Sequence, residues 1–247
     1  MKKLKLQNYL GDALGTPLHR KSFLKYTAIS GAAIALGLES CSKVNDFFPG
    51  KHNSGNGNQK TIDVGSGDTG ILNFAYAREQ LEAAFYTQVN YSFYSGISDE
   101  EKSILTDIMY HEVIHRNFFK AALGSAAIPA LDVDFSAIDF SSRTSVLSTA
   151  KALEDTGVSA YNGAGAYISS AAYLTLAGKI VSVEARHASA IRDLLNPKSA
   201  DFAGDDVVNP TTGLDFSRTP NSTMGGPSIV ATANMFLKTK ISANHLP

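Results

Sequence analysis

The sequence predicts an all-α fold, a four-helix bundle with one long crossover, preceded by a signal peptide and a flexible tether. Four segments have apolar residues at helical spacing, and short segments join the first two and the last two. About twenty residues with Pro and scattered Asp separate these pairs, as a crossover requires. With 247 residues, 44% hydrophobic and 18% charged, the chain can bury one sizeable core, so we expect one main domain.

Residues 1–41 have the pattern of an export signal. Basic residues come first, and the apolar stretch "YTAISGAAIALGL" follows. This stretch is too short for a good transmembrane helix and is typical of the apolar region of a signal. It runs into "LESC", where Cys41 is the only cysteine of the protein. The basic residues of this leader are Lys2, Lys3, Lys5, Arg20, Lys21 and Lys25.

"HRKSFLKYTAISGAAIALGLESC" resembles a twin-arginine export signal that ends in a lipoprotein processing box. Lys21 stands where the second arginine usually is, and Glu39 is unusual in such a box, so the twin-arginine and general secretory routes both remain open. The resemblance implies that Cys41 becomes the lipidated first residue of an exported protein, anchored to a membrane of the cell envelope. The alternative is a generic secretory signal whose cysteine is incidental.

Charge and cysteine content exclude some classes of function. The leader holds six of the 22 Lys and Arg and two of the 23 Asp and Glu, which leaves 16 against 21, a net charge of −5. A mildly acidic body without a basic patch argues against a nucleic-acid partner. A lone cysteine excludes an internal disulfide framework and a four-cysteine metal site.

The first two helices follow a linker. Residues 42–67 are rich in Gly, Asn and Ser, which is typical of a flexible tether. The first helix is expected from Asp68 to just before Gly96. The second is expected from Ser98, where Ser-x-x-Glu predicts a capping box, to Gly124, a residue type suited to the position after a helix end.

The last two helices follow the crossover. The third is expected over about Arg143–Asn162, where "NGAGA" interrupts the pattern, and the fourth over about Ser169–Leu195, before Pro197. The bundle therefore covers residues 68–195. Residues 196–247 are expected to form a C-terminal extension that packs on the bundle, mostly as loop, with one helical candidate in "PSIVATANMFLKTKI".

Two of the helices carry a Glu-x-x-His pattern. Glu112 and His115 are three residues apart and share a helix face, and Glu184 and His187 repeat the spacing in the fourth helix. Apolar residues surround both pairs, so we expect these faces to point inward. One such pair is weak support for a metal site, because an exposed ion pair has the same spacing.

The other two helices strengthen the pattern. Glu79 precedes Tyr86 by seven residues, and Glu154 precedes Tyr161 by seven. Glu79 and Glu154 are 75 residues apart, and Glu112 and Glu184 are 72 apart, so the second half repeats the first. Four unrelated salt bridges have no reason to show this order.

The set resembles the ferritin-like di-iron carboxylate superfamily, in which two helices each give one Glu and two give Glu-x-x-His. More narrowly, "ILNFAYAREQLEAAFY", "HEVIH", "ALEDTGVSAY" and "VEARHASAIR" resemble exported bacterial ferritin-like proteins related to the desiccation-associated group. The resemblance implies a ferritin-like four-helix bundle that holds two iron or manganese ions. Its implied ligands are Glu79, Glu112, His115, Glu154, Glu184 and His187, with Glu112 and Glu184 bridging the metals.

Some neighbouring residues are ambiguous. The resemblance implies that Tyr86 and Tyr161 hydrogen-bond the carboxylates and can be oxidised. Glu82 lies on nearly the same face as Glu79 and is either an extra ligand or, as we favour, a polar partner. His111 has no counterpart in the fourth helix, where Val183 takes its place, so we expect it to face a neighbouring helix or water.

Two functions fit these features. The first is an envelope-anchored oxidoreductase that acts on iron(II), O₂ or peroxide; a peroxidase-like cycle would need an external electron donor, because the chain lacks a cysteine-rich iron domain. The second is a non-enzymatic envelope protein of stress or desiccation, with a metal-free or inert polar core.

Overall fold

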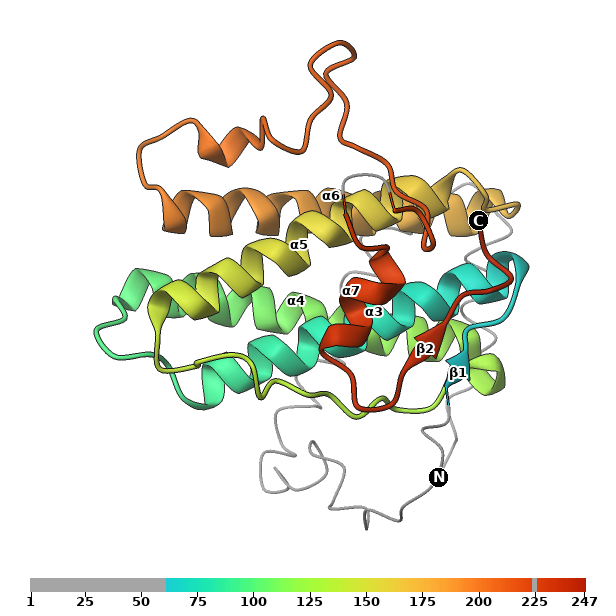
Figure 1. The fold of residues 1–247 in the computed structure, drawn as a ribbon, viewed down its shortest axis with the longest axis horizontal. Coiled ribbons are helices and arrows are strands. Elements are labelled where there is room, and N and C mark those ends of the chain that lie inside the picture. Colours follow the sequence, from blue (N-terminus) through green and yellow to red (C-terminus); the bar gives the residue numbers. More distant parts are fainter. Residues whose placement is uncertain (1–60, 224–225) are drawn as a thin grey trace, which may run out of the picture. The chain divides into compact units, whose positions relative to one another are not determined.

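The computed structural model describes residues 61–223 and 226–247 (Figure 1). Its four long helices are α3 (Gly67–Tyr91), α4 (Asp99–Leu123), α5 (Arg143–Gly165) and α6 (Ala171–Leu195). The short elements are β1 (Ile62–Asp63), η3 (Gly124–Ala126), η4 (Asp201–Ala203), α7 (Ile229–Met235) and β2 (Ile241–Ser242). The predicted all-α bundle is confirmed. The predicted signal over residues 1–41, with Cys41, and most of the linker over 42–67 lie outside the described residues.

The four helices form two hairpins. Helix α3 packs most extensively against α4, and α5 against α6. Residues 127–142 join the hairpins and form the crossover that the sequence predicts. Each hairpin therefore contributes one helix with a single Glu and one with Glu-x-x-His.

Side-chain caps explain why three of the helices begin where they do. Ser98 and Glu101 make both hydrogen bonds of the predicted capping box at α4. Ser142 and Ser170 accept backbone N–H bonds at the starts of α5 and α6. Helix α4 ends just before Gly124, whose φ of +55° favours glycine. The third helix runs past the expected end near Asn162 to Gly165.

Helix α3 is buried on nearly every side because the crossover covers its outer face. The Asn73 amide donates to the carbonyl of Ala126 and accepts from the N–H of Ile128, both at 2.9 Å. Farther along, Gln80 accepts from the N–H of Leu131. The Phe85 ring lies 5.8 Å from the ring of Phe140, which also belongs to the crossover. These contacts leave α3 almost no exposed side, so its polar residues must find partners inside the protein.

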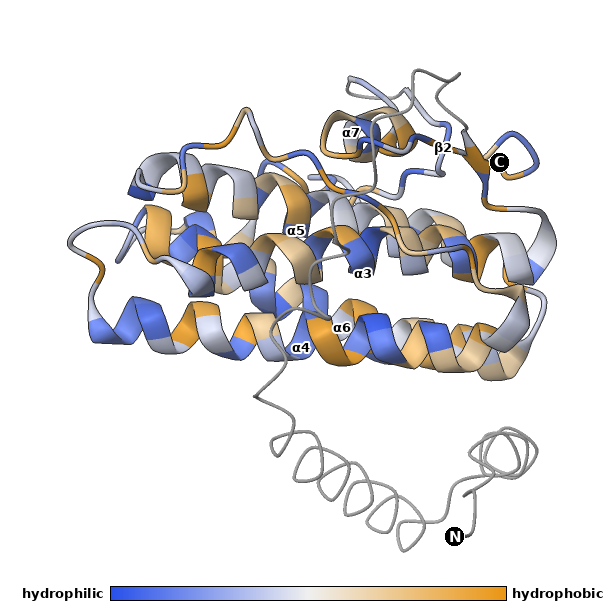
Figure 2. Cartoon of the chain, turned by 90° about the horizontal axis from the view of Figure 1, so that it is seen from below, coloured by the Kyte–Doolittle hydropathy of each residue, from blue (hydrophilic) through white to orange (hydrophobic). Residues whose placement is uncertain are grey.

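The C-terminal segment lies over the crossover and the start of the described chain. Strand β2 pairs in parallel with β1, and Ile241 is opposite Ile62. The N–H of Asp134 donates to the carbonyl of Phe236 at 2.7 Å, and Ile229 of α7 is fully buried. Figure 2 shows α7 and β2 on the side of α3 and α5 that faces away from α4 and α6. Among the described residues, no helix is long and apolar enough to cross a membrane.

Candidate metal site

The centre of the bundle holds one carboxylate from each long helix. Glu79 comes from α3, Glu112 from α4, Glu154 from α5 and Glu184 from α6, and all four side chains are fully buried. His115 and His187 lie beside them and are also buried. Burying one unpaired charge costs several kcal/mol, which is comparable to the whole free energy of unfolding of a typical protein. These groups therefore need partners or a metal.

The six predicted ligands form two overlapping groups. The first is Glu79, Glu112, His115 and Glu184, and the second is Glu112, Glu154, Glu184 and His187. In each group one donor atom per residue lies within 4.8 Å of the others. Glu112 and Glu184 belong to both groups, so they occupy the places that bridging carboxylates would take.

Each histidine points its Nδ1 atom into one group. The Nδ1 of His115 lies 2.9 Å from Oε1 of Glu184 and 3.4 Å from Oε2 of Glu79. The Nδ1 of His187 lies 2.8 Å from Oε1 of Glu112 and 3.5 Å from Oε2 of Glu154. The two Nδ1 atoms thus serve different groups, one for each half of the sequence repeat.

The tyrosines hold the outer oxygens of the two single carboxylates. The Tyr86 hydroxyl donates to Oε1 of Glu154 at 2.5 Å, and the Tyr161 hydroxyl donates to Oε1 of Glu79. Each tyrosine therefore bonds the carboxylate from the other hairpin. Burial, and then the charge of the bonded carboxylate, raise the pKa of both hydroxyls well above the usual range.

The side-chain atoms that face the centre of the site show whether it is suited to a metal. Buried atoms without a hydrogen-bond partner include Oε2 of Glu79 and of Glu154, both oxygens of Glu112 and of Glu184, and Nδ1 of both histidines. The short distances between the histidine nitrogens and the carboxylate oxygens are therefore not hydrogen bonds, because the angles are unsuitable. Buried polar atoms in folded proteins are almost always paired, so this concentration of unpaired ligand atoms fits a site for metal ions. The buried acidic and histidine groups could hold a metal.

The site perturbs the pKa of its own groups. Burial and the charge of Glu79 raise the pKa of Glu112 to about 7, and burial and the charge of Glu112 raise that of Glu184 well above its usual range. Burial disfavours the charged form of His187, but its contacts with Glu112 and Glu154 outweigh this and raise its pKa to about 10. The protein thus holds protons where a cation would otherwise balance the carboxylates.

Glu82 belongs to neither donor group, and one of its oxygens is paired with a buried arginine, while Oε2 has no hydrogen-bond partner. The Nη2 atom of Arg78 donates to Oε1 of Glu82 at 2.6 Å and to the carbonyl of Leu153 at 2.9 Å. A Cβ at Gly157 would lie 3.2 Å from the same Nη2. Glycine at this place in α5 therefore leaves the room that the guanidinium fills.

His111 makes a contact with a predicted ligand that the sequence did not indicate. As expected, it faces a neighbouring helix, but its Nδ1 lies 2.9 Å from Nε2 of His187, a predicted ligand. Burial and the nearby His187 lower the pKa of His111. The spacing of four residues between His111 and His115 places both on one face of α4 and could have kept His111 among the candidates.

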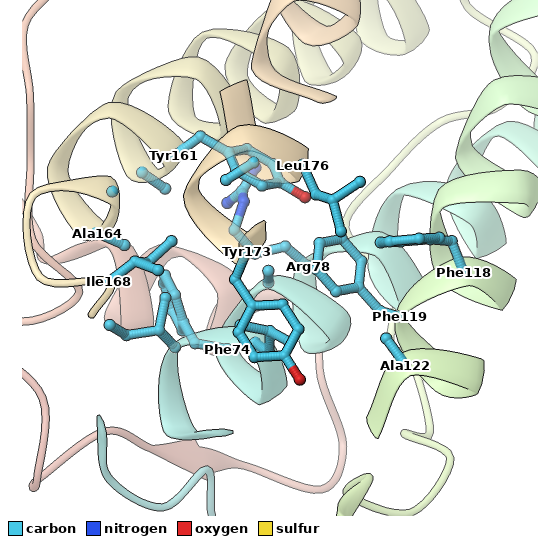
Figure 3. A pocket seen from close by; sticks show the side chains of 16 residues that line it. Phe74, Arg78, Phe118, Phe119, Ala122, Tyr161, Ala164, Ile168, Tyr173 and Leu176 are labelled. Carbon is cyan, nitrogen blue, oxygen red and sulfur yellow. The ribbon is translucent and has the colours of Figure 1, made fainter. Parts of the chain in front are cut away.

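A small apolar pocket lies beside the site (Figure 3). Phe74, Phe118 and Phe119 are among its lining residues, together with Arg78 and Tyr161. Its volume is about 30 Å³, more than the roughly 10–15 Å³ that one water-sized molecule needs. Because Tyr161 bonds Glu79, the wall of the pocket touches a site carboxylate directly.

Comparison with known proteins agrees with the fold. No curated protein matches the sequence. A family model described as a ferritin-like domain matches residues 67–197, from the start of α3 to just past the end of α6. Because this match covers more than half of the chain, the chain belongs to the ferritin-like domain family.

Proposed function

We propose that the protein holds two iron or manganese ions and acts as an oxidoreductase on iron(II), O₂ or peroxide. The observation that carries this proposal is the set of unpaired inward atoms in two overlapping groups. Carboxylate and imidazole donors suit iron and manganese. Two such divalent ions would neutralise the four buried carboxylates of the site, Glu79, Glu112, Glu154 and Glu184.

The hydrogen bonds of the four carboxylates indicate which of them would bind one metal ion and which would bind both. Glu79 and Glu154 each give one oxygen to a tyrosine and keep one for a metal, as a ligand to a single ion would. Glu112 and Glu184 keep both oxygens unpaired, as bridging ligands would. His115 and His187 would each add one nitrogen. When bound, the metal pair would supply electrons to an oxidant.

The protein residues around the site would control protons and access. The hydroxyls of Tyr86 and Tyr161 orient two carboxylates and carry protons within reach of them. The helices exclude bulk water, since all four carboxylates are fully buried. A peroxidase-like cycle would take its electrons from an external donor.

Metal analysis tests the site. Protein refolded with iron(II) or manganese(II) should contain close to two ions per chain, and the Glu112→Ala, Glu184→Ala double variant should lose them. Glu100→Ala, which removes an exposed carboxylate of the same helix, is the matched control. Stoichiometric metal in the double variant would overturn the assignment.

Kinetics separate the enzyme from the second candidate, a non-enzymatic envelope protein of stress or desiccation. Stopped-flow absorbance follows iron(II)-loaded protein after mixing with O₂ or peroxide. An active site oxidises iron faster than free iron(II) is oxidised in the same buffer. A rate equal to that of free iron(II) would favour the inert protein.

The apolar pocket favours O₂ as the oxidant. Peroxide would lose its hydrogen bonds with water on entering such a lining, whereas O₂ has none to lose. Ala122→Leu, which fills part of the pocket, should slow oxidation by O₂ more than oxidation by peroxide and leave metal content unchanged. The control is Ala152→Leu on the exposed side of α5. Equal slowing with both oxidants would contradict a route through this pocket.

We also propose that the protein is exported and anchored to the cell envelope through a lipid on Cys41. The basic leader, the apolar stretch and the single cysteine support this location. Cys41→Ala should move the protein from the membrane fraction to the soluble fraction. An unchanged distribution would rule out the lipid anchor.

A further inference from the structure

The two halves of the site differ around one histidine. The imidazole rings of His187 and His111 lie nearly parallel, with centroids 5.1 Å apart and planes 12° apart, and their facing nitrogens lie 2.9 Å apart. The sequence repeat places Val183 where a counterpart of His111 would be. Helix α6 thus offers His115 no histidine at the corresponding place.

The contact between these nitrogens determines which nitrogen of His187 can bind a metal. A neutral imidazole carries one N–H, and its other nitrogen has the free lone pair that a metal needs. The Nδ1 of His187 faces the carboxylates, so binding there requires the proton on Nε2. That proton then has an acceptor in Nδ1 of His111. A partner on the second nitrogen is the usual device that orients a ligand histidine.

We propose that His111 is a positioning residue that holds His187 with its Nδ1 toward Glu112 and Glu154, which makes the two metal positions unequal. The inference rests on the proposed metal site. In the described part of the chain, the position of His187 has this support, whereas Val183 stands where His115 would need a corresponding histidine.

The geometry argues against His111 as a ligand itself. Its Nδ1 is turned to His187, and His111 belongs to neither donor group. The His111 side chain is also exposed, while that of Glu112, the next residue, is fully buried. His111 therefore acts through His187.

Metal titration of the chelator-treated full chain tests the proposal. Manganese(II) binding is measured by competition with a chromophoric chelator. His111→Leu should weaken the binding of one of the two ions by about 10–100-fold and leave the affinity for the other unchanged. His111→Asn should restore most of the loss, because its Oδ1, like Nδ1 of histidine, is bonded to Cγ and can accept the same N–H. Tyr110→Leu, at an exposed neighbour on α4, is the control.

Several results would overturn the proposal. Unchanged binding of both ions in His111→Leu would show that the contact positions nothing. Equal weakening of both ions without rescue by asparagine would show a general structural effect. Wild-type protein that binds no metal would overturn the proposed function, and this inference with it.

A measurement without metal separates the inference from the proposed function. Nitrogen-15 NMR of the chelator-treated protein should show Nδ1 of His111 unprotonated and accepting a hydrogen bond. A protonated Nδ1 in a protein that still binds two metals would overturn the inference alone.

Discussion

Arg78 and Glu82 form a buried ion pair that the second half of the repeat does not share. The offset of 75 residues places Leu153 and Gly157 at the corresponding positions of α5. Both charged side chains are almost fully buried, and the guanidinium also donates to the carbonyl of Leu153. The pair thus adds no net charge to the site, although a lone Glu82 would add one more buried anion.

Removing one member of this pair should strongly destabilise the protein, but replacing both members with apolar residues should not. Arg78→Met should lower the free energy of unfolding by about 3–5 kcal/mol, because it leaves a buried carboxylate without its partner. Adding Glu82→Leu should recover most of the loss. Urea denaturation measures both variants. Lys102→Met, which removes an exposed ion pair in α4, should cost no more than about 1 kcal/mol. A double variant as unstable as the single one would contradict this account.

At the scale of the element, α5 shows where the sequence reasoning stopped being sufficient. The pattern "NGAGA" predicts an end near Asn162, because glycine is a poor helix former. The helix nevertheless continues to Gly165, and Gly163 lies against the backbone of Arg218, where any side chain would collide with the Arg218 carbonyl. This glycine is required by a contact with a distant segment, which the local sequence does not reveal.

Two glycine substitutions separate these effects. The methyl group added by Gly178→Ala in α6 would lie in open space. This substitution should stabilise the protein by up to about 1 kcal/mol, because alanine has the higher helix propensity. Gly163→Ala should instead destabilise it by about 1–3 kcal/mol, because the segment around Arg218 must shift. Thermal unfolding measures both, and limited proteolysis should cut the loosened segment faster. Stabilisation by Gly163→Ala would contradict the contact.

The sequence predicted the ligand residues of the candidate site but not the contacts around them. Spacing and apolar neighbours predicted inward faces for the two Glu-x-x-His pairs, since i and i+3 share a side of a helix. The resemblance to the ferritin-like superfamily supplied the set of six ligands, and the repeat distinguished His115 from His111. The contacts of His111 with His187, and of Arg78 with Leu153, join different helices. Such contacts depend on how the helices face each other, which spacing along one helix does not specify.

For the whole molecule, burial of the site should make the metal-free protein sensitive to pH. The pKa of Glu112 is about 7, raised from 4.5 by burial and by Glu79, so ionisation costs more in the folded state than in the unfolded state. The pKa of His187 is about 10, raised from 6.5 by contacts with Glu112 and Glu154 that outweigh burial. Folded protein therefore binds more protons than unfolded protein over both intervals.

The sign of the effect follows from this difference. The stabilisation from Glu112 is present below pH 4.5 and is lost as the pH rises through 7, and that from His187 is lost between 6.5 and 10. The chelator-treated protein should thus unfold at lower urea concentration as the pH rises from 5 to 9. Manganese(II) should reverse the trend, because metal replaces protons at the ligands. A metal-free stability that rises with pH would contradict these pKa directions.

The distribution of donors over the two helical hairpins has one more consequence. Each donor group takes residues from both hairpins, and each tyrosine bonds a carboxylate across the boundary between them. Neither hairpin alone holds a complete coordination sphere, so a metal ion would act as a cross-link between two halves of one chain. A single hairpin could complete such a centre only by pairing with a second copy of itself. His111 and the Arg78–Glu82 pair are features that a symmetric pair of identical hairpins could not confine to one half.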